Sequence, residues 1–179
     1  AQRNREKLMS AALTLLAEAG PDVPLEAVAR QAGVGIGTLY RHFPTREALV
    51  EAAYRSELLR LCAAADELVA EEPGDVALRT WMDRFVDYMT TKRGMADALR
   101  AVIASGLNPY AESRDRLLAA IGTLLQAGIE AGTVRSDVEA ADVLASLTGV
   151  SLAAGEPAKR EQAGRMLDLL MDGLRYRAS

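Results

Sequence analysis

The sequence is poor in the residues on which most catalytic and metal sites depend. Its 179 residues include one histidine, one cysteine and one tryptophan, and aromatic residues make up only 4% of the chain. There is no CxxC pair, no phosphate-binding glycine loop and no G-x-S-x-G elbow. We therefore expect a protein that is not an enzyme and that binds neither a metal ion nor a cofactor.

Long apolar runs are also missing. No uninterrupted apolar run reaches about 18 residues, and no charged segment followed by an apolar one opens the sequence. We expect neither a membrane span nor a secretory signal, and hence a cytoplasmic location. The single cysteine, Cys62, fits a reducing compartment and lies among leucines and alanines, which predicts a packing role for its thiol.

The alternation of apolar and polar residues that marks β-strands is absent as well. Apolar residues recur every three or four positions along almost the whole chain, which predicts an all-α fold of about nine helices. The first helix should end at Gly20-Pro21 and the second should start at Pro24. The later helices are expected at 35–43, Thr45 to about Ala70, 76–91 with Asp75 as N-cap, 95–104, Tyr110 or Glu112 to Gly132, Asp137 to Gly155 with Ser136 and Glu139 as a capping box, and a final helix around residues 166–174.

The most informative stretch is a pair of short helices joined by a glycine. The first helix has an apolar face over residues 25–32, and Gly33 follows where a chain must enter the left-handed region to turn sharply. The second helix, residues 35–43, ends before Pro44. This layout is typical of a helix-turn-helix that reads DNA.

The charge of this stretch is opposite in sign to that of the whole chain. Residues 30–46 contain three arginines and no acidic residue, in a chain with 25 acidic residues and a formal charge of −4. A basic, acid-free surface on an acidic protein is expected of a face that binds the phosphate backbone of DNA. Each feature alone also has a structural interpretation, and a single histidine such as His42 is more often structural than functional.

Charge also divides the chain into a head and a body. Residues 1–55 carry seven basic and six acidic residues, which leaves 14 basic and 19 acidic residues for the rest, or +1 against −5. We therefore expect a DNA-binding domain at residues 1–50 and a second domain at residues 51–179 that stays away from DNA.

Three segments carry a more specific resemblance. They are REKLMSAALTLLAEAG and LEAVARQAGVGIGTLYRHFPTREAL near the start, and WMDRFVDYMTTKRGMADAL at residues 81–99. The first two lie between Asn4 and Tyr54 and resemble, without a gap, the DNA-binding domain of the TetR family of bacterial regulators. The third is similar to the C-terminal domain of an actinobacterial subgroup of that family. The resemblance implies a homodimer that binds a double-stranded DNA operator, most often as a repressor, and that leaves the operator when a small molecule binds the body.

The resemblance also assigns roles to individual residues. Residues 35–43 would be the recognition helix, with Gly35, Ile36, Gly37 and Thr38 at base edges and Tyr40, Arg41 and His42 at phosphates or adjoining bases. Thr38 would touch a thymine methyl group or donate a hydrogen bond. Thr45 and Arg46 would hold the DNA backbone at the start of the next helix, and Arg3 and Arg5 would add contacts.

Two positions depart from the pattern of the family. Members frequently have a lysine at the position of Ile36 and a threonine cap at the position of Pro24. Isoleucine cannot donate a hydrogen bond to a base, and proline offers neither a hydroxyl nor an N–H to a phosphate. We therefore expect affinity to depend mainly on Arg41, His42 and Arg46.

The body contains a concentration of large, adaptable apolar side chains. They are Trp81, Met82, Phe85, Tyr88, Met89, Met95, Leu99 and Ile103. Such side chains line pockets for apolar ligands, and they fill ordinary cores still more often. The resemblance favours a pocket, for a hydrophobic or aromatic effector because few charges lie among these residues. The alternative is a helical small-molecule carrier without DNA activity, which gives no reason for the acid-free stretch.

The last two helices have apolar stripes wider than one neighbouring helix requires. The positions predicted to form a dimer interface are Leu144, Leu147, Val150, Met166, Leu167, Leu170, Met171 and Leu174. An ordinary core within one chain is the alternative. The resemblance favours an interface of four helices about a two-fold axis, since the corresponding helices dimerise in TetR proteins.

Overall fold

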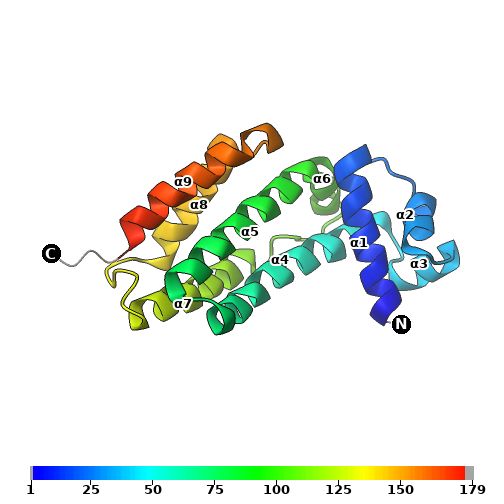
Figure 1. Ribbon diagram of the computed structural model, residues 1–179. Coiled ribbons are helices and arrows are strands. Elements are labelled where there is room, and N and C mark those ends of the chain that lie inside the picture. Colours follow the sequence, from blue (N-terminus) through cyan, green and yellow to red (C-terminus); the bar gives the residue numbers. More distant parts are fainter. Residues whose placement is uncertain (1, 176–179) are drawn as a thin grey trace. The chain divides into compact units, whose positions relative to one another are not determined.

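Helical periodicity determines the secondary structure of this chain. A computed structural model describes residues 2–175, and within that range it has nine α-helices, one short 3₁₀ helix and no strand beyond an isolated bridge between Val134 and Arg175 (Figure 1). The elements are α1 (Gln2–Ala19), α2 (Leu25–Ala32), α3 (Ile36–His42), α4 (Arg46–Glu71), α5 (Gly74–Gly94), α6 (Ala96–Ala104), α7 (Ser113–Glu130), α8 (Ala140–Ala154), η1 (Pro157–Lys159) and α9 (Arg160–Leu174). The predicted all-α fold is confirmed. None of the helices in the described range is long and apolar enough to cross a membrane.

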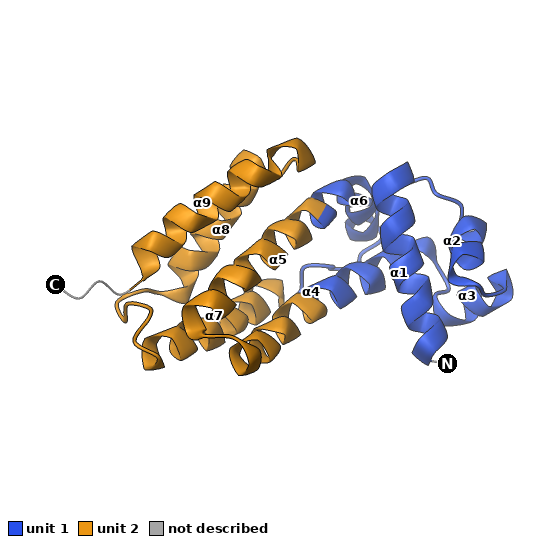
Figure 2. Cartoon of the chain, in the orientation of Figure 1, with its two compact units in different colours: residues 1–58, 91–111 blue, residues 59–90, 112–179 orange. Residues whose placement is uncertain are grey.

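The helices form two compact units (Figure 2). Among the described residues, unit 1 comprises those up to Leu58 together with 91–111, and unit 2 comprises 59–90 together with those from Glu112 onward. Helices α4 and α5 therefore each have one part in either unit. The segment 91–111, which contains α6, clusters with the predicted head and not with the rest of the predicted body.

The core of unit 1 joins the apolar faces of α1, α2 and α3. Its buried residues include Leu8, Ala12 and Leu16 on α1, Leu25, Val28, Ala29 and Ala32 on α2, and Leu39 on α3. The turn between α2 and α3 depends on Gly33, which has φ 69° and ψ 34°. Its N–H donates to the carbonyl of Arg30 at 3.1 Å, and the N–H of Val34 donates to that of Ala29 at 3.0 Å. The predicted left-handed glycine turn is confirmed.

The helix starts in unit 1 follow local capping rules. Thr45 caps α4, because its hydroxyl oxygen accepts a hydrogen bond from the N–H of Ala48 at 3.1 Å. Pro24 occupies the N-cap position of α2 with φ −62° and ψ 139°, and no side chain caps that helix. The second helix therefore starts one residue later than predicted, at Leu25.

Unit 2 packs the second part of α4 with α5, α7, α8 and α9. Its fully buried side chains include Leu78, Trp81, Met82, Ile121, Leu124, Leu147 and Leu167. Ion pairs also join α5 to α9: Arg160 Nη2 lies 2.8 Å from Asp83 Oδ1, and Arg79 Nε lies 2.8 Å from Asp168 Oδ1. These pairs are partly exposed, so the apolar core contributes more to stability than they do.

One predicted cap of unit 2 is wrong. Asp75 is not the N-cap of α5, since that helix already includes Gly74. The Asp75 carboxylate accepts a hydrogen bond from Arg175 Nε at 3.2 Å instead. Arg175, which is 100 residues later in the chain, therefore binds the carboxylate that was predicted to cap the helix.

The predicted start of α8 is also wrong. The helix begins at Ala140 and not at Asp137, and Glu139 is its N-cap without a side-chain cap bond. Arg135 explains the delay, because its guanidinium donates to both carboxylate oxygens of Asp137, at 2.6 and 2.7 Å. The N–H of Arg135 donates to the carbonyl of Leu174 at 2.9 Å, so tertiary contacts hold this segment outside a helix.

Candidate nucleic-acid interface

Helix α3 has a buried side and an exposed side. Leu39 is fully buried and fixes the inner side. Ile36 and Tyr40, one turn apart, are 37% and 47% exposed, and Gly37 and Arg41 form the neighbouring exposed row. We call Ile36, Gly37, Tyr40 and Arg41 the α3 outer face. Four residues predicted to contact DNA are thus brought together on one exposed surface.

Neither glycine around this face is required by close packing within the chain, and Gly35 occupies an N-cap position, where glycine is common. Gly35 is the N-cap of α3 with φ −71°, and Gly37 has no positive φ. A Cβ atom added to either would meet nothing within 4 Å. Gly37 is the second residue of α3, where glycine destabilises the helix by at most about 0.5–1 kcal/mol relative to alanine, and packing within this protein does not account for its choice. What the glycine does provide is room for another surface to approach the backbone of α3.

Arg41 folds back along α3. Its Nη2 donates to Thr38 Oγ1 at 2.9 Å, and its Nε donates to the carbonyl of Gly37 at 3.3 Å. Thr38 is half-buried at the edge of the outer face. Its oxygen therefore already accepts a hydrogen bond, while its hydroxyl hydrogen remains available as a donor.

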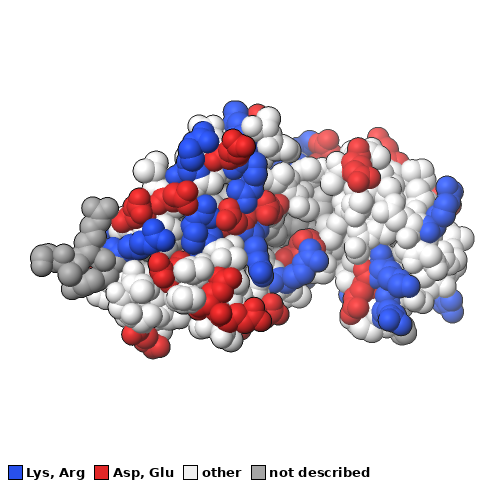
Figure 3. Space-filling model, viewed as in Figure 1, with Lys and Arg blue, Asp and Glu red and all other residues white. Residues whose placement is uncertain are grey.

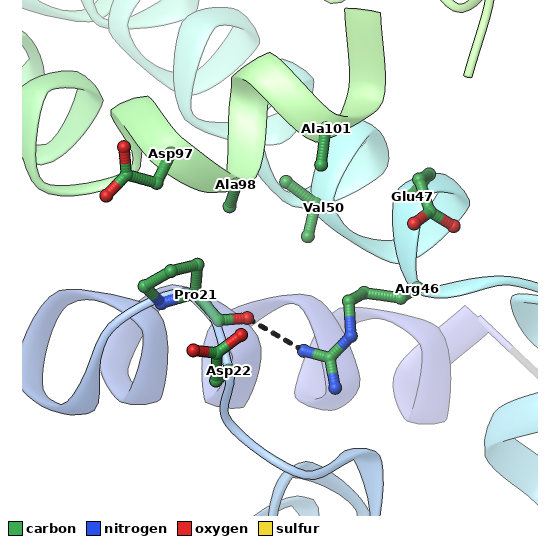
Figure 4. A pocket seen from close by; sticks show the side chains of 8 residues that line it. All are labelled: Pro21, Asp22, Arg46, Glu47, Val50, Asp97, Ala98 and Ala101. Carbon is green, nitrogen blue, oxygen red and sulfur yellow. Dashed lines mark hydrogen bonds between the residues drawn. The ribbon is translucent and has the colours of Figure 1, made fainter. Parts of the chain in front are cut away.

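Arg46 borders a pocket that lies within unit 1. Arg46 Nη1 donates to the carbonyl of Pro21 at 3.1 Å, and Figure 4 shows its side chain extending from the start of α4 toward the α1–α2 turn. The pocket has a volume of about 360 Å³ and is lined by Pro21, Asp22, Arg46, Glu47, Val50, Asp97, Ala98 and Ala101. Sequence reasoning missed this contact, which ties α4 to a turn 25 residues earlier.

Two other predicted contact residues lie near Phe43, which is buried. The guanidinium carbon of Arg5 is 5.1 Å from the centre of the Phe43 ring. The rings of His42 and Phe43 have centres 6.3 Å apart and are tilted by 46°. Arg5 is thus partly engaged within unit 1, whereas Arg3 is exposed.

The surface charge differs between the two units (Figure 3). The part of unit 1 where Figure 1 places α2 and α3 shows basic and uncharged side chains on the face in view. Over unit 2 the basic and acidic side chains are intermixed, which agrees with the ion pairs between α5 and α9. On this face, the appearance of α2 and α3 agrees with the acid-free sequence of residues 30–46.

The residues predicted to bind the effector are divided between the units. Those from Trp81 to Met89 lie on α5 in unit 2, whereas Met95, Leu99 and Ile103 lie in unit 1. The Trp81 indole N–H donates to the carbonyl of Leu61 at 2.8 Å, so this buried polar group is already satisfied. Met95 and Leu99 are buried as well, but Ile103 is 49% exposed.

The thiol of Cys62 is half-buried in unit 2. Burial raises the pKa of the Cys62 thiol above its ordinary value, and the positive charge of Arg116 opposes this effect only in part. The group is therefore mostly protonated at neutral pH and is a poor nucleophile. This environment supports the predicted packing role.

Six of the eight predicted interface residues lie in the core of a single protomer. Leu144, Leu147, Val150, Leu167, Met171 and Leu174 are all buried, while Met166 and Leu170 are half-buried. The large apolar side chains that α8 and α9 leave exposed are Leu152 and Leu169, each 73% exposed. Neither leucine is among the eight predicted positions, because the broad stripes of both helices did not reveal which edge faces the core.

Family models match both parts of the chain. The model of bacterial regulatory proteins of the tetR family matches residues 8–53, which include the helix-turn-helix. The model of the C-terminal domain of SbtR-like transcriptional regulators matches residues 72–176, more than half of the chain.

Solved structures agree with this assignment. The TetR transcriptional regulator SCO0520 from Streptomyces coelicolor is 53% identical, with 97% of this chain and 99% of that chain covered and a TM-score of 0.93. A TetR transcription regulatory protein from Mycobacterium vanbaalenii is 35% identical, with 98% and 96% covered and a TM-score of 0.80.

A curated relative matches a shorter segment. The HTH-type transcriptional repressor KstR of Mycolicibacterium smegmatis is 40% identical over 68 residues, which span 37% of this chain and 33% of the length of KstR. Together with the two family models and the structural relatives, this match leads to one conclusion. The chain belongs to the TetR family of bacterial transcriptional regulators, whose members bind DNA operators and act as dimers.

Proposed function

We propose that this chain is a repressor that binds its operator through the α3 outer face and leaves it when a small hydrophobic or aromatic molecule binds the body. The observation that supports operator binding is the exposed α3 outer face. It presents Ile36, Gly37, Tyr40 and Arg41 from a helix whose other side is fixed by the buried Leu39. The similarity to KstR, which is named a repressor, supports the direction of regulation.

Each polar group near α3 has a role in this proposal. Arg41 exchanges its hydrogen bond with Thr38 for one with a phosphate, which frees the Thr38 oxygen at a base edge. The two heads of a dimer then occupy successive major grooves, about 34–36 Å apart. Because α4 and α5 each run through both units, a ligand that shifts these helices in unit 2 also shifts them in unit 1.

Fluorescence anisotropy with DNA tests the proposed function. The purified protein is titrated into the duplex that flanks its own gene and into a scrambled duplex, at several salt concentrations. We expect saturable binding with a preference of about a thousandfold or more, and loss of binding when an effector is added. Failure to bind any duplex even at low salt would favour the carrier alternative.

Replacing Gly37 by alanine separates folding from DNA binding. The free energy of unfolding of the variant is expected to rise by at most about 0.5–1 kcal/mol, because alanine favours the helix and its methyl group meets no atom of the chain. Its operator Kd should rise about tenfold or more, since the added methyl group blocks close approach to DNA. Denaturant unfolding and anisotropy measure the two effects.

Gly122→Ala is the matched control, because Gly122 also lies in a helix and its Cβ would meet nothing within 4 Å. This variant should gain similar stability without a change in operator Kd. An unchanged Kd for Gly37→Ala would contradict close approach at α3.

Arg46→Ala and Thr38→Ala should have different effects on DNA binding. Arg46→Ala is expected to weaken binding to every sequence, to reduce the slope of log K against log salt by about one, and to lower stability by about 1 kcal/mol through loss of the bond to Pro21. Thr38→Ala should instead change which sequences are preferred. Anisotropy on a panel of duplexes separates the two outcomes.

Arg30→Ala, at an exposed position of α2, is the control for stability. We expect it to unfold like the wild type. Identical effects of Arg46→Ala and Thr38→Ala across the panel would refute this division between backbone and base contacts.

A further inference from the structure

One large apolar side chain stands on the surface that is proposed to meet DNA. Ile36 is 37% exposed at the start of α3, whereas Leu39, three positions later on the same helix, is fully buried. The packing of unit 1 therefore leaves more than a third of the Ile36 surface uncovered. Its flanks are bare, because Gly35 and Gly37 carry no side chain and the space around their Cβ positions is empty. Ile36 therefore projects from the part of α3 that another surface can approach most closely.

We propose that Ile36 is a specificity-determining residue that reads the C5-methyl group of a thymine in each operator half-site. This assignment rests on the proposed function, since it concerns the same face of α3. A helix that enters the major groove meets base edges made mostly of hydrogen-bond donors and acceptors, and the thymine methyl group is the only methyl group among the four bases. Isoleucine has no donor or acceptor, so contact with any other base edge would leave the polar atoms of that base without a partner.

The neighbours of Ile36 on α3 are less suited to this contact. Thr38 also has a methyl group, but the residue is half-buried, and in the proposed complex its freed hydroxyl is directed to a polar base edge. Tyr40 is exposed one turn after Ile36, and its hydroxyl favours a phosphate or a polar base edge. Ile36 therefore remains as the apolar contact of the outer face.

The test begins with selection of operator sequences from a pool of random duplexes by the wild-type protein. Each thymine of the selected operator is then replaced, one at a time, by deoxyuridine, which lacks only the methyl group. Burial of one methyl group corresponds to about a fourfold change in Kd. We expect one thymine in each half-site at which the replacement weakens wild-type binding by about that factor, as measured by anisotropy.

Two variants assign the effect to its residue. Ile36→Ala should bind the thymine and deoxyuridine operators equally, with about the affinity of the wild type for an operator that carries deoxyuridine at this position in both half-sites, because both copies of the dimer carry the substitution. Thr38→Ala is the control, and it should retain the difference between the two operators. Circular dichroism verifies that both variants keep the helical content of the wild type, and the scan of the wild-type protein is independent of either variant.

The possible failures are distinguishable. If the pool yields a preferred sequence but no deoxyuridine position matters, or if Ile36→Ala keeps the full difference, the assignment of Ile36 is wrong and the proposed DNA binding stands. If Thr38→Ala abolishes the difference, the methyl group is read by Thr38. If the pool yields no preferred sequence, the proposed function fails and the assignment of Ile36 fails with it.

Discussion

Replacing Leu169 by glutamate is expected to raise the dissociation constant of the dimer by about a hundredfold or more. Leu169 is 73% exposed on α9 in the protomer, so this side chain is available to a second copy of the chain. An unpaired carboxylate buried at an interface costs several kcal/mol, and each copy of the variant contributes one. Sedimentation equilibrium over a range of concentrations measures the change in mass.

The Leu169→Glu variant should also lose operator affinity, because a monomer reaches only one of two half-sites. Leu152→Glu tests α8 in the same way, since Leu152 is equally exposed. The matched control is Leu59→Glu, which changes a leucine that is 47% exposed on α4 and should leave the dimer intact. If all three variants remain dimers, the interface lies elsewhere.

Gly74→Ala is expected to lower the free energy of unfolding by about 3 kcal/mol, near the upper end for overpacking. Gly74 is buried at the start of α5, and a Cβ there would lie 2.6 Å from Gly128 Cα and 2.9 Å from the carbonyl oxygen of Ala127. These are backbone atoms of α7, which cannot rotate away as a side chain can. The two helices must therefore separate, and the contacts around them are lost.

Thermal unfolding measures this effect, and a loss of about 3 kcal/mol corresponds to a fall in Tm of about 6–12 °C for a chain of this size. Gly122→Ala again serves as the control, since it adds the same methyl group to α7 in open space. A Gly74→Ala variant as stable as the wild type would mean that α5 and α7 do not approach as closely as their glycines allow.

Features that depend on a few neighbouring residues could be predicted from the sequence. The apolar spacing of residues 25–32, the left-handed turn at Gly33 and the cap formed by Thr45 are all confirmed, because each is decided within one helical turn. The acid-free stretch at residues 30–46 is read directly from the sequence, because it is a property of composition. These local features were also the ones that carried the resemblance to the TetR family.

Contacts between distant residues could not be predicted in this way. The bond from Arg46 to Pro21, the capture of Asp75 by Arg175 and the late start of α8 all depend on residues that only the fold brings together. The neighbouring helices decide which edge of each apolar stripe faces the core. They therefore also decide that Leu152 and Leu169 are exposed. The sequence by itself determined that the chain is helical and where the helix-turn-helix lies, because these follow from local periodicity and turn chemistry. The tertiary structure alone decided which side chains remain free for a partner, because burial depends on every helix packed around them.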